Sequence, residues 1–206
     1  DPRSKNTLTT IKNQFQTGTC WAFAALSCTE SNLIQKGLEN QNVQFSVPSL
    51  VLSTYANGGF DESIWDCGGT WMDSSLAMAA HRGLCYDEYE PFVSDGTEAT
   101  IVSEEKKGVC EYQLNYASTI TGGRNAIKNK IKELGGVLVS YYADDLYMTF
   151  DNKSYYDPET TKYSGINHAV SVVGWDDNYS KSNFLAGYQP KKNGAWLVKG
   201  SWGVSS

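Results

Sequence analysis

The spacing of apolar residues predicts that helices dominate the chain before about residue 110. From Cys20 to about Lys36, apolar side chains recur every three or four positions, as on one face of a helix, and Gly37 supplies a stop signal. A second helix is predicted to begin at Ser46, and a third to run from Met72 to about His81. The first half is therefore expected to be mainly helical.

The pattern changes in the second half, where strands are predicted to dominate. One more helix is expected from Asn125 to Leu134, because its apolar residues keep helical spacing. Strands are predicted at residues 137–141, 169–175 and 195–199, which are short, apolar and rich in β-branched residues. The long polar connection over residues 176–194 indicates a hairpin between the last two strands.

Composition places the chain among soluble globular proteins. The chain has 206 residues, of which 40% are hydrophobic and 19% charged, enough for one large domain or two tightly joined lobes. The net charge is −6 without a basic patch, so nucleic acid and anionic membranes are not expected as partners. No apolar stretch approaches the roughly 20 residues that a membrane span needs.

The most informative position is Cys20, where a polar, glycine-containing loop meets the first helical pattern. A thiol at a helix start faces the positive end of the peptide dipoles, which favours the nucleophilic thiolate. Free cysteine is also a common packing residue in protein cores. Because the chain has five cysteines, the local pattern leaves both interpretations open.

The chain has only two histidines, and one of them is a candidate base. His81 falls at a predicted helix end and is interpreted as structural or solvated. His168 stands immediately before the predicted strand 169–175, where a side chain can point into a cleft. Imidazole titrates near neutrality, so His168 together with Cys20 favours a cysteine nucleophile activated by a histidine base.

Three segments resemble those that carry the catalytic residues of the papain/cathepsin family of cysteine peptidases. Residues 12–23 (Lys-Asn-Gln-Phe-Gln-Thr-Gly-Thr-Cys-Trp-Ala-Phe) are similar to the nucleophile segment. Residues 167–175 (Asn-His-Ala-Val-Ser-Val-Val-Gly-Trp) resemble the histidine segment. Residues 196–203 (Trp-Leu-Val-Lys-Gly-Ser-Trp-Gly) resemble the segment of the asparagine that orients the histidine. Smaller similarities lie at residues 1–3, 46–53 and 67–69.

This resemblance covers nearly the whole chain and implies its fold. The expected class is α+β, a papain-like two-lobe fold in one peptidase domain over residues 1–206. A helical lobe would span about residues 14–110. A β-rich, barrel-like lobe would contain residues 111–206 and the N-terminal segment. The cleft between the lobes would bind an extended polypeptide.

The resemblance also implies a mechanism. Cys20 resembles the nucleophile and His168 its base, as a thiolate–imidazolium pair that forms an acyl-enzyme which water hydrolyses. Gln14 matches the glutamine whose side-chain amide, with the Cys20 backbone N–H, would hold the oxyanion. No cofactor and no metal are expected. A calcium site in the acidic loop 144–157 is not favoured, because the carboxylates lack calcium-loop spacing.

Further residues are implied to bind or shield the substrate. A glycine pair would offer its backbone to an extended peptide, as an added strand does. A tryptophan and an alanine would form the wall of the main specificity pocket, and a second indole would cover the histidine from water. The complete set is Gly68, Gly69, Trp71, Asn167, Ala169 and Trp202.

The chain departs from the family pattern at the orienting asparagine, because position 200 is Gly200. Glycine has no side chain to hold the imidazole. A water or another side chain could substitute, the protein could be a weakened or inactive homologue, or the position could have been altered. We expect retained but reduced activity, since an orienting residue acts on geometry and not on bond making. Phe15 also replaces a glycine that usually follows the oxyanion glutamine.

The usual disulfides of the helical lobe are also expected to be absent. Thr17 stands where the family has the cysteine that pairs with one like Cys67, and Ser53 stands where the partner of one like Cys110 would be. A different bridge between Cys85 and Cys110 remains open.

The expected function is a cysteine endopeptidase acting on polypeptides. Residues 175–181 are most similar to bacterial secreted or cell-surface members, so this location is expected. The family also implies an inhibitory pro-segment as a partner, which this chain does not contain. The alternative is a catalytically silent papain-fold module that binds peptides or proteins. A third interpretation is a cysteine transferase that passes the acyl group to an acceptor other than water.

Overall fold

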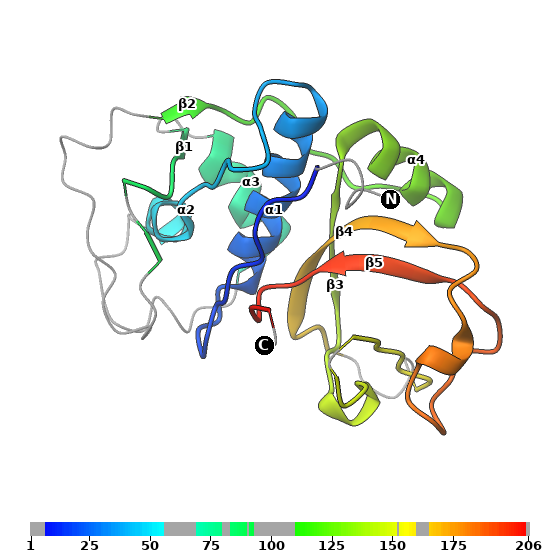
Figure 1. The fold of residues 1–206 in the computed structure, drawn as a ribbon. Coiled ribbons are helices and arrows are strands. Elements are labelled where there is room, and N and C mark those ends of the chain that lie inside the picture. The colour runs from blue at the N-terminus through cyan, green and yellow to red at the C-terminus, as the bar shows by residue number, and fades with distance from the viewer. Residues whose placement is uncertain are drawn as a thin grey trace.

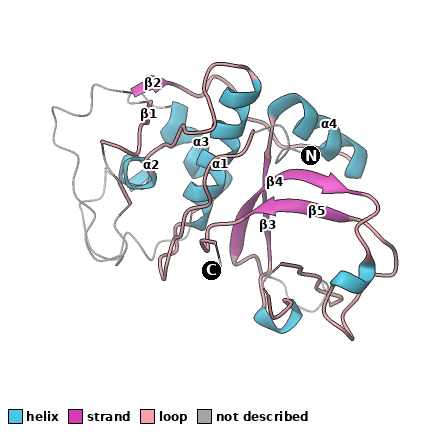
Figure 2. Cartoon of the chain, in the orientation of Figure 1, coloured by secondary structure: helices cyan, strands magenta, loops and turns pink. Residues whose placement is uncertain are grey.

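A computed structural model describes residues 7–55, 69–79, 83–89, 91–92, 110–151, 153–159 and 165–204. Three helices and a two-stranded sheet gather on one side of the molecule, and a three-stranded sheet with one helix forms the other (Figure 1; Figure 2). The first group contains α1 (Cys20–Gln35), α2 (Val47–Tyr55), α3 (Trp71–Ala79), β1 (Leu84–Cys85) and β2 (Cys110–Tyr112). The second contains α4 (Arg124–Leu134), β3 (Val137–Tyr141), β4 (His168–Asp176) and β5 (Ala195–Lys199), with the short helices η3 (Asp145–Tyr147) and η4 (Lys181–Asn183).

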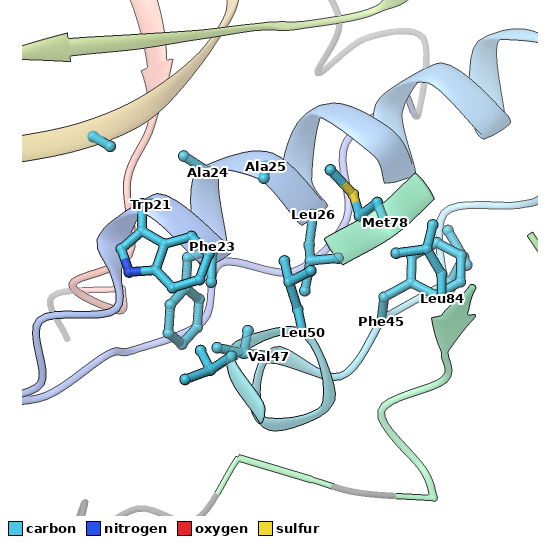
Figure 3. Close-up of a cluster of buried hydrophobic side chains, with 14 of the residues drawn as sticks. Trp21, Phe23, Ala24, Ala25, Leu26, Phe45, Val47, Leu50, Met78 and Leu84 are labelled. Atoms are coloured by element: carbon cyan, nitrogen blue, oxygen red, sulfur yellow. The ribbon is translucent and has the colours of Figure 1, made fainter. Parts of the chain in front are cut away.

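Helix α1 is the central element of the core. It begins at Cys20 and ends at Gln35, and the chain then turns at Gly37 with a φ of 70°, a conformation that glycine adopts readily. Trp21, Phe23 and Leu26 are buried against side chains from α2 and α3 (Figure 3). The opposite side of α1 contacts β4. The first helix was therefore predicted correctly, but it is buried on more than one face.

Helix α2 begins as the sequence predicted. The Ser46 hydroxyl accepts a hydrogen bond from the Ser49 backbone N–H at 3.0 Å, which satisfies a donor of the first turn. Leu50 and Val51 are buried in the core. This helix packs against α1 and α3 and closes the helical side of the molecule.

The three-stranded sheet has the antiparallel order β3-β4-β5. Its central strand, β4, is buried from His168 to Gly174, because α1 and α4 lie against it. Gly135 ends α4 with a φ of 88°, and β3 begins two residues later. The β4–β5 pairing confirms the predicted hairpin over residues 176–194.

Most predicted elements are confirmed, with small differences at their ends. His168 was placed before its strand but is the first residue of β4, where it pairs with Tyr141 of β3. In the stretch 86–124, for which no periodicity was found, β2 pairs with β1. Cys85 and Cys110 are opposite each other in this pairing, and a bridge between them stays a prediction. His81 and Cys67 lie outside the described residues, and the proposed lobe boundaries stay a prediction.

Within the described ranges, none of the helices combines the length and apolar character required to cross a bilayer.

Candidate active site

Three segments that are far apart in the sequence converge beside the head of α1. The backbone N–H of Gln14 donates to the Ser201 carbonyl at 2.7 Å, and Asn13 forms a bridge with Trp202. The N–H of Gly203 donates back to the N-terminal segment at Lys12, at 3.0 Å. The loop before Cys20 is therefore fixed to the segment that follows β5.

The His168 imidazole is enclosed by two aromatic rings. The Trp202 indole stacks on it with ring centroids 4.4 Å apart and an interplanar angle of 19°. Tyr141 meets it edge-to-face at 5.7 Å and 76°. His168 is 6% exposed, whereas Trp202 is 48% exposed and forms the outer cover. The indole thus covers one face of the imidazole, and its role in shielding the site from water stays a prediction.

One nitrogen of His168 is buried without a hydrogen-bond partner. This atom, Nε2, has no acceptor within the described residues. Burial lowers the pKa of His168 to about 4, because the charged imidazolium loses solvation. The neutral imidazole is therefore favoured at neutral pH, which opposes a preformed thiolate–imidazolium pair.

The position that would carry an acceptor is open. A Cβ atom placed on Gly200 would meet no heavy atom within 4 Å, and the φ of Gly200 is not in the left-handed region. The backbone at position 200 is thus compatible with an L-residue such as asparagine. That the missing side chain at position 200 leaves Nε2 of His168 without its acceptor stays a prediction.

Gln14 is held so that part of its amide is still available. Its Nε2 donates to the Thr17 carbonyl at 2.6 Å, and its Oε1 accepts from the Ser201 hydroxyl at 2.5 Å. A primary amide has two N–H donors, so one remains for an anion. These bonds explain why a polar side chain only 6% exposed is stable there.

Cys20 occupies the first position of α1, where backbone N–H groups lack carbonyl partners in their own helix. Its side chain is half-buried. The pKa of Tyr141 is raised to about 12, first by burial and then by the charge of Cys20. Helix α1, which begins at Cys20, packs against β4, which begins at His168, so the elements that carry the candidate nucleophile and the candidate base are in contact.

An open groove of about 480 Å³ adjoins Gln14 and His168. Gln14, His168 and Trp202 line one part of it, and Asp144 and Asp145 line another. The groove could receive part of an extended chain, and its carboxylates would favour a positively charged group.

Asn167 also lines this groove, but its amide is engaged with the backbone. Its Oδ1 accepts from the Ala143 N–H at 2.6 Å, and its Nδ2 donates to the Ala143 carbonyl at 2.8 Å. These bonds close the loop between β3 and β4 next to His168. A contact between Asn167 and substrate stays a prediction.

Of the remaining predicted binding residues, Gly69 and Ala169 do not line the groove beside His168. Gly69 lies against the Trp21 indole, where a Cβ atom would come within 2.7 Å of Nε1, so glycine is required there by packing. Ala169 is 6% exposed and belongs to the helical core. Gly68 lies outside the described residues, and Trp71 begins α3 with its side chain outside them. Their roles in substrate binding stay predictions.

Phe15 adopts a φ of 51°, a region that bulky side chains rarely occupy. The family's glycine at this position would avoid that strain. Phe15 is 43% exposed, next to Gln14, and its N–H donates to the Asn13 side chain at 2.8 Å.

A buried polar network, which the sequence did not reveal, ties together the segments that carry the site. Thr9 donates to the Glu30 carboxylate, and Lys199 donates to the Thr9 hydroxyl at 2.5 Å. Lys199 and Glu30 also form an ion pair at 3.6 Å, and the Phe45 N–H donates to Glu30 at 3.1 Å. The network joins the strand before Gly200, the helix of Cys20 and the segment leading to Gln14. The one hint in the sequence was Glu30, a carboxylate that follows Leu26 by four residues and therefore falls on the apolar face of the helix.

Over the ranges that the structure describes, no cluster of three or more histidine, cysteine or carboxylate side chains could hold a metal ion.

Comparison with known proteins gives one consistent family. The chain matches the family described as papain family cysteine protease over residues 1–206. It is 28% identical to mouse procathepsin L over 212 residues, covering 98% of this chain and 55% of that protein. It is also 28% identical to mouse cathepsin K over 206 residues, covering 100% of this chain and 55% of that protein. The chain thus spans about half the length of these curated relatives.

The solved structures agree with the fold. The cysteine protease and lectin-like domains of a surface layer associated protein of Clostridium difficile match with a TM-score of 0.81 and 29% identity, covering 98% of this chain and 44% of that chain. The predicted α+β papain-like fold is confirmed.

We predict that removing one partner of the buried ion pair destabilises the whole site region. Lys199→Met leaves the Glu30 carboxylate buried without its cation, so the free energy of unfolding should fall by about 3–5 kcal/mol. Urea denaturation followed by fluorescence measures this. The control is Lys130→Met, which removes an exposed pair with Glu133 at 2.7 Å and should change stability by less than about 1 kcal/mol. Equal effects of the two substitutions would contradict the role given to the network.

Proposed function

Because the chain belongs to the papain family of cysteine proteases, we propose that it is an endopeptidase with Cys20 as nucleophile and His168 as base. The observation that carries this proposal is that the helix begun by Cys20 packs against the strand begun by His168, while the Gln14 amide is fixed in the loop before Cys20. The substrate would be an extended polypeptide that enters the groove beside His168.

The proposed reaction begins with a neutral imidazole. As the Cys20 sulfur bonds to the peptide carbonyl carbon, His168 accepts the thiol proton. The carbonyl oxygen becomes negative and receives hydrogen bonds from the Gln14 amide and the Cys20 N–H, each donor typically worth about 2.7–4 kcal/mol. His168 then gives the proton to the departing amine, which leaves an acyl-enzyme. Water, deprotonated by His168, cleaves the thioester and restores the thiol.

The missing acceptor at position 200 explains why the rate should be reduced. During attack His168 becomes an imidazolium, whose buried Nε2–H has no acceptor. A buried donor left unsatisfied costs about 1–3 kcal/mol, and here that cost rises as positive charge develops on the ring. The reaction therefore keeps its nucleophile, base and oxyanion donors. Its activation free energy is higher, because the imidazolium charge lacks a hydrogen-bond acceptor at Nε2.

Similar proteins support a location and a partner. One structural neighbour is described as a surface layer associated protein of Clostridium difficile, so we propose a secreted or cell-surface bacterial protein. The similarity to procathepsin L supports an inhibitory pro-segment as a polypeptide partner in addition to substrates.

A silent peptide-binding module is the second candidate. The observation in its favour is the same buried Nε2 of His168, which has no hydrogen-bond partner among the described residues. A base that cannot hold a proton would leave binding without turnover. The two candidate functions differ in whether the Cys20 thiol reacts and whether the protein hydrolyses peptide bonds.

We predict that wild-type protein hydrolyses an unfolded protein such as casein, and that Cys20→Ala reduces this to the level of buffer. Cys28→Ala is the matched control and should retain activity. Burial raises the pKa of Cys28 to about 12, so its thiol is inert at neutral pH. Iodoacetamide at pH 7 should modify Cys20 first and stop hydrolysis in parallel. Slow modification of both thiols at alkaline pH only, without hydrolysis, would support the silent module.

We further predict that Gly200→Asn increases kcat/KM by about ten- to a hundredfold, because an amide oxygen could accept from Nε2 and remove the cost of an unsatisfied donor. The free energy of unfolding should not fall, since the site of the new Cβ is open. Gly123→Asn is the control, because a Cβ at this helix cap also meets no atom and the position is away from His168. An unchanged or lower kcat/KM in Gly200→Asn would contradict the proposed cause of the reduced rate.

A further inference from the structure

His168 belongs to a row of aromatic rings that extends behind it into the β3–β4 loop. Tyr141 contacts His168 on one side and Tyr155 on the other, the latter at 5.3 Å and 61°. The Tyr155 hydroxyl donates to the Tyr142 carbonyl at 2.6 Å, and Tyr155 forms a bridge with Met148. The ring that contacts His168 is therefore itself held from behind.

Tyr141 is also fixed by the backbone. It is directly opposite His168 in the antiparallel β3–β4 pair, so the two side chains project from facing positions of adjacent strands. Because the sheet sets this pairing, the distance between the rings does not depend on a flexible loop.

The outer torsion of a histidine side chain has no sharp minima and needs neighbours to define it. A hydrogen bond to Nε2 would do this, but no acceptor is present among the described residues. The stacked indole of Trp202 limits tilting of the ring, and an edge-to-face neighbour on another side limits its rotation.

We propose that Tyr141 is a positioning residue that, with Trp202, holds the His168 imidazole in the orientation that an acceptor at position 200 would otherwise fix. The proposal rests on the proposed peptidase function. It predicts that either the Tyr141 ring or an acceptor side chain at position 200 can orient the imidazole. Loss of the Tyr141 ring should therefore lower activity most when position 200 is glycine.

The phenol is suited to a place beside the thiol. Burial and the nearby Cys20 charge raise the pKa of Tyr141 to about 12, so the hydroxyl stays neutral and adds no negative charge. Asp144 and Asp145 are the carboxylates that line the groove together with His168.

The test is a double-mutant cycle on kcat/KM with Tyr141→Leu and Gly200→Asn. Tyr141→Leu should lower kcat/KM about tenfold in the Gly200 background, since such an aromatic pair is worth up to about one decade. In the Gly200→Asn background the loss should be less than about twofold, because the new hydrogen bond orients the ring. Tyr141→Phe keeps the ring and should retain wild-type kcat/KM. Equal losses from Tyr141→Leu in both backgrounds would overturn the proposal.

A second readout does not depend on activity. The ¹H NMR shifts of the His168 ring report its position within the neighbouring aromatic rings, and a His81→Gln variant assigns them, since the chain has two histidines. They should move toward solvent values in Tyr141→Leu and stay fixed in Tyr188→Leu, which removes a tyrosine that contacts Tyr147 at 5.0 Å. If Tyr141→Leu does not fold, Tyr155→Leu removes the support behind Tyr141 and should produce the same direction of shift.

The two readouts separate the two proposals. Absence of hydrolysis in wild type and in Gly200→Asn would refute the peptidase, while shifts that respond to Tyr141 would still support the positioning role. Unchanged His168 shifts in a folded Tyr141→Leu, or in Tyr155→Leu where Tyr141→Leu does not fold, would overturn the positioning role even if the protein hydrolyses casein.

Discussion

The buried Nε2 of His168, which lacks an acceptor, constrains everything else at the site. A charged imidazolium is costly in that position, because it loses water and gains no hydrogen bond at this nitrogen. The ring is therefore expected to rest neutral and to take up positive charge only during proton transfer. In the proposed mechanism, Cys20 and the oxyanion donors can be in place while the rate is limited by His168.

Buried polar contacts fix the segments that surround His168 relative to one another. The Glu30–Lys199–Thr9 network joins α1, β5 and the N-terminal segment, and the hydrogen bonds between Gln14 and Ser201 extend this connection to the oxyanion donor. A displacement of any of these segments would move the Cys20 thiol, the Gln14 amide or Gly200 relative to His168. Orientation of reacting groups contributes several kcal/mol to catalysis, so this rigidity matters to function.

Local sequence patterns predicted the helix and the strand that carry the candidate nucleophile and base. The start of α1 at Cys20 and the strand directly after His168 follow from hydrophobic periodicity, and Gln14 follows from the family resemblance alone. Tyr141 could not be identified in this way, because its contact with His168 depends on the register between β3 and β4. Gly69 was assigned to substrate binding, whereas its contact with Trp21 shows a packing requirement that only the folded chain reveals.

The pKa of His168, measured by NMR titration in the wild type and in Gly200→Asn, tests the central claim most directly. The account predicts that the wild-type pKa lies well below its usual value of 6.5, near 4, because the ring is buried without an acceptor. In Gly200→Asn the pKa should rise, because an acceptor for Nε2–H stabilises the charged form. A wild-type pKa at or above 6.5, or no increase in Gly200→Asn, would contradict the account.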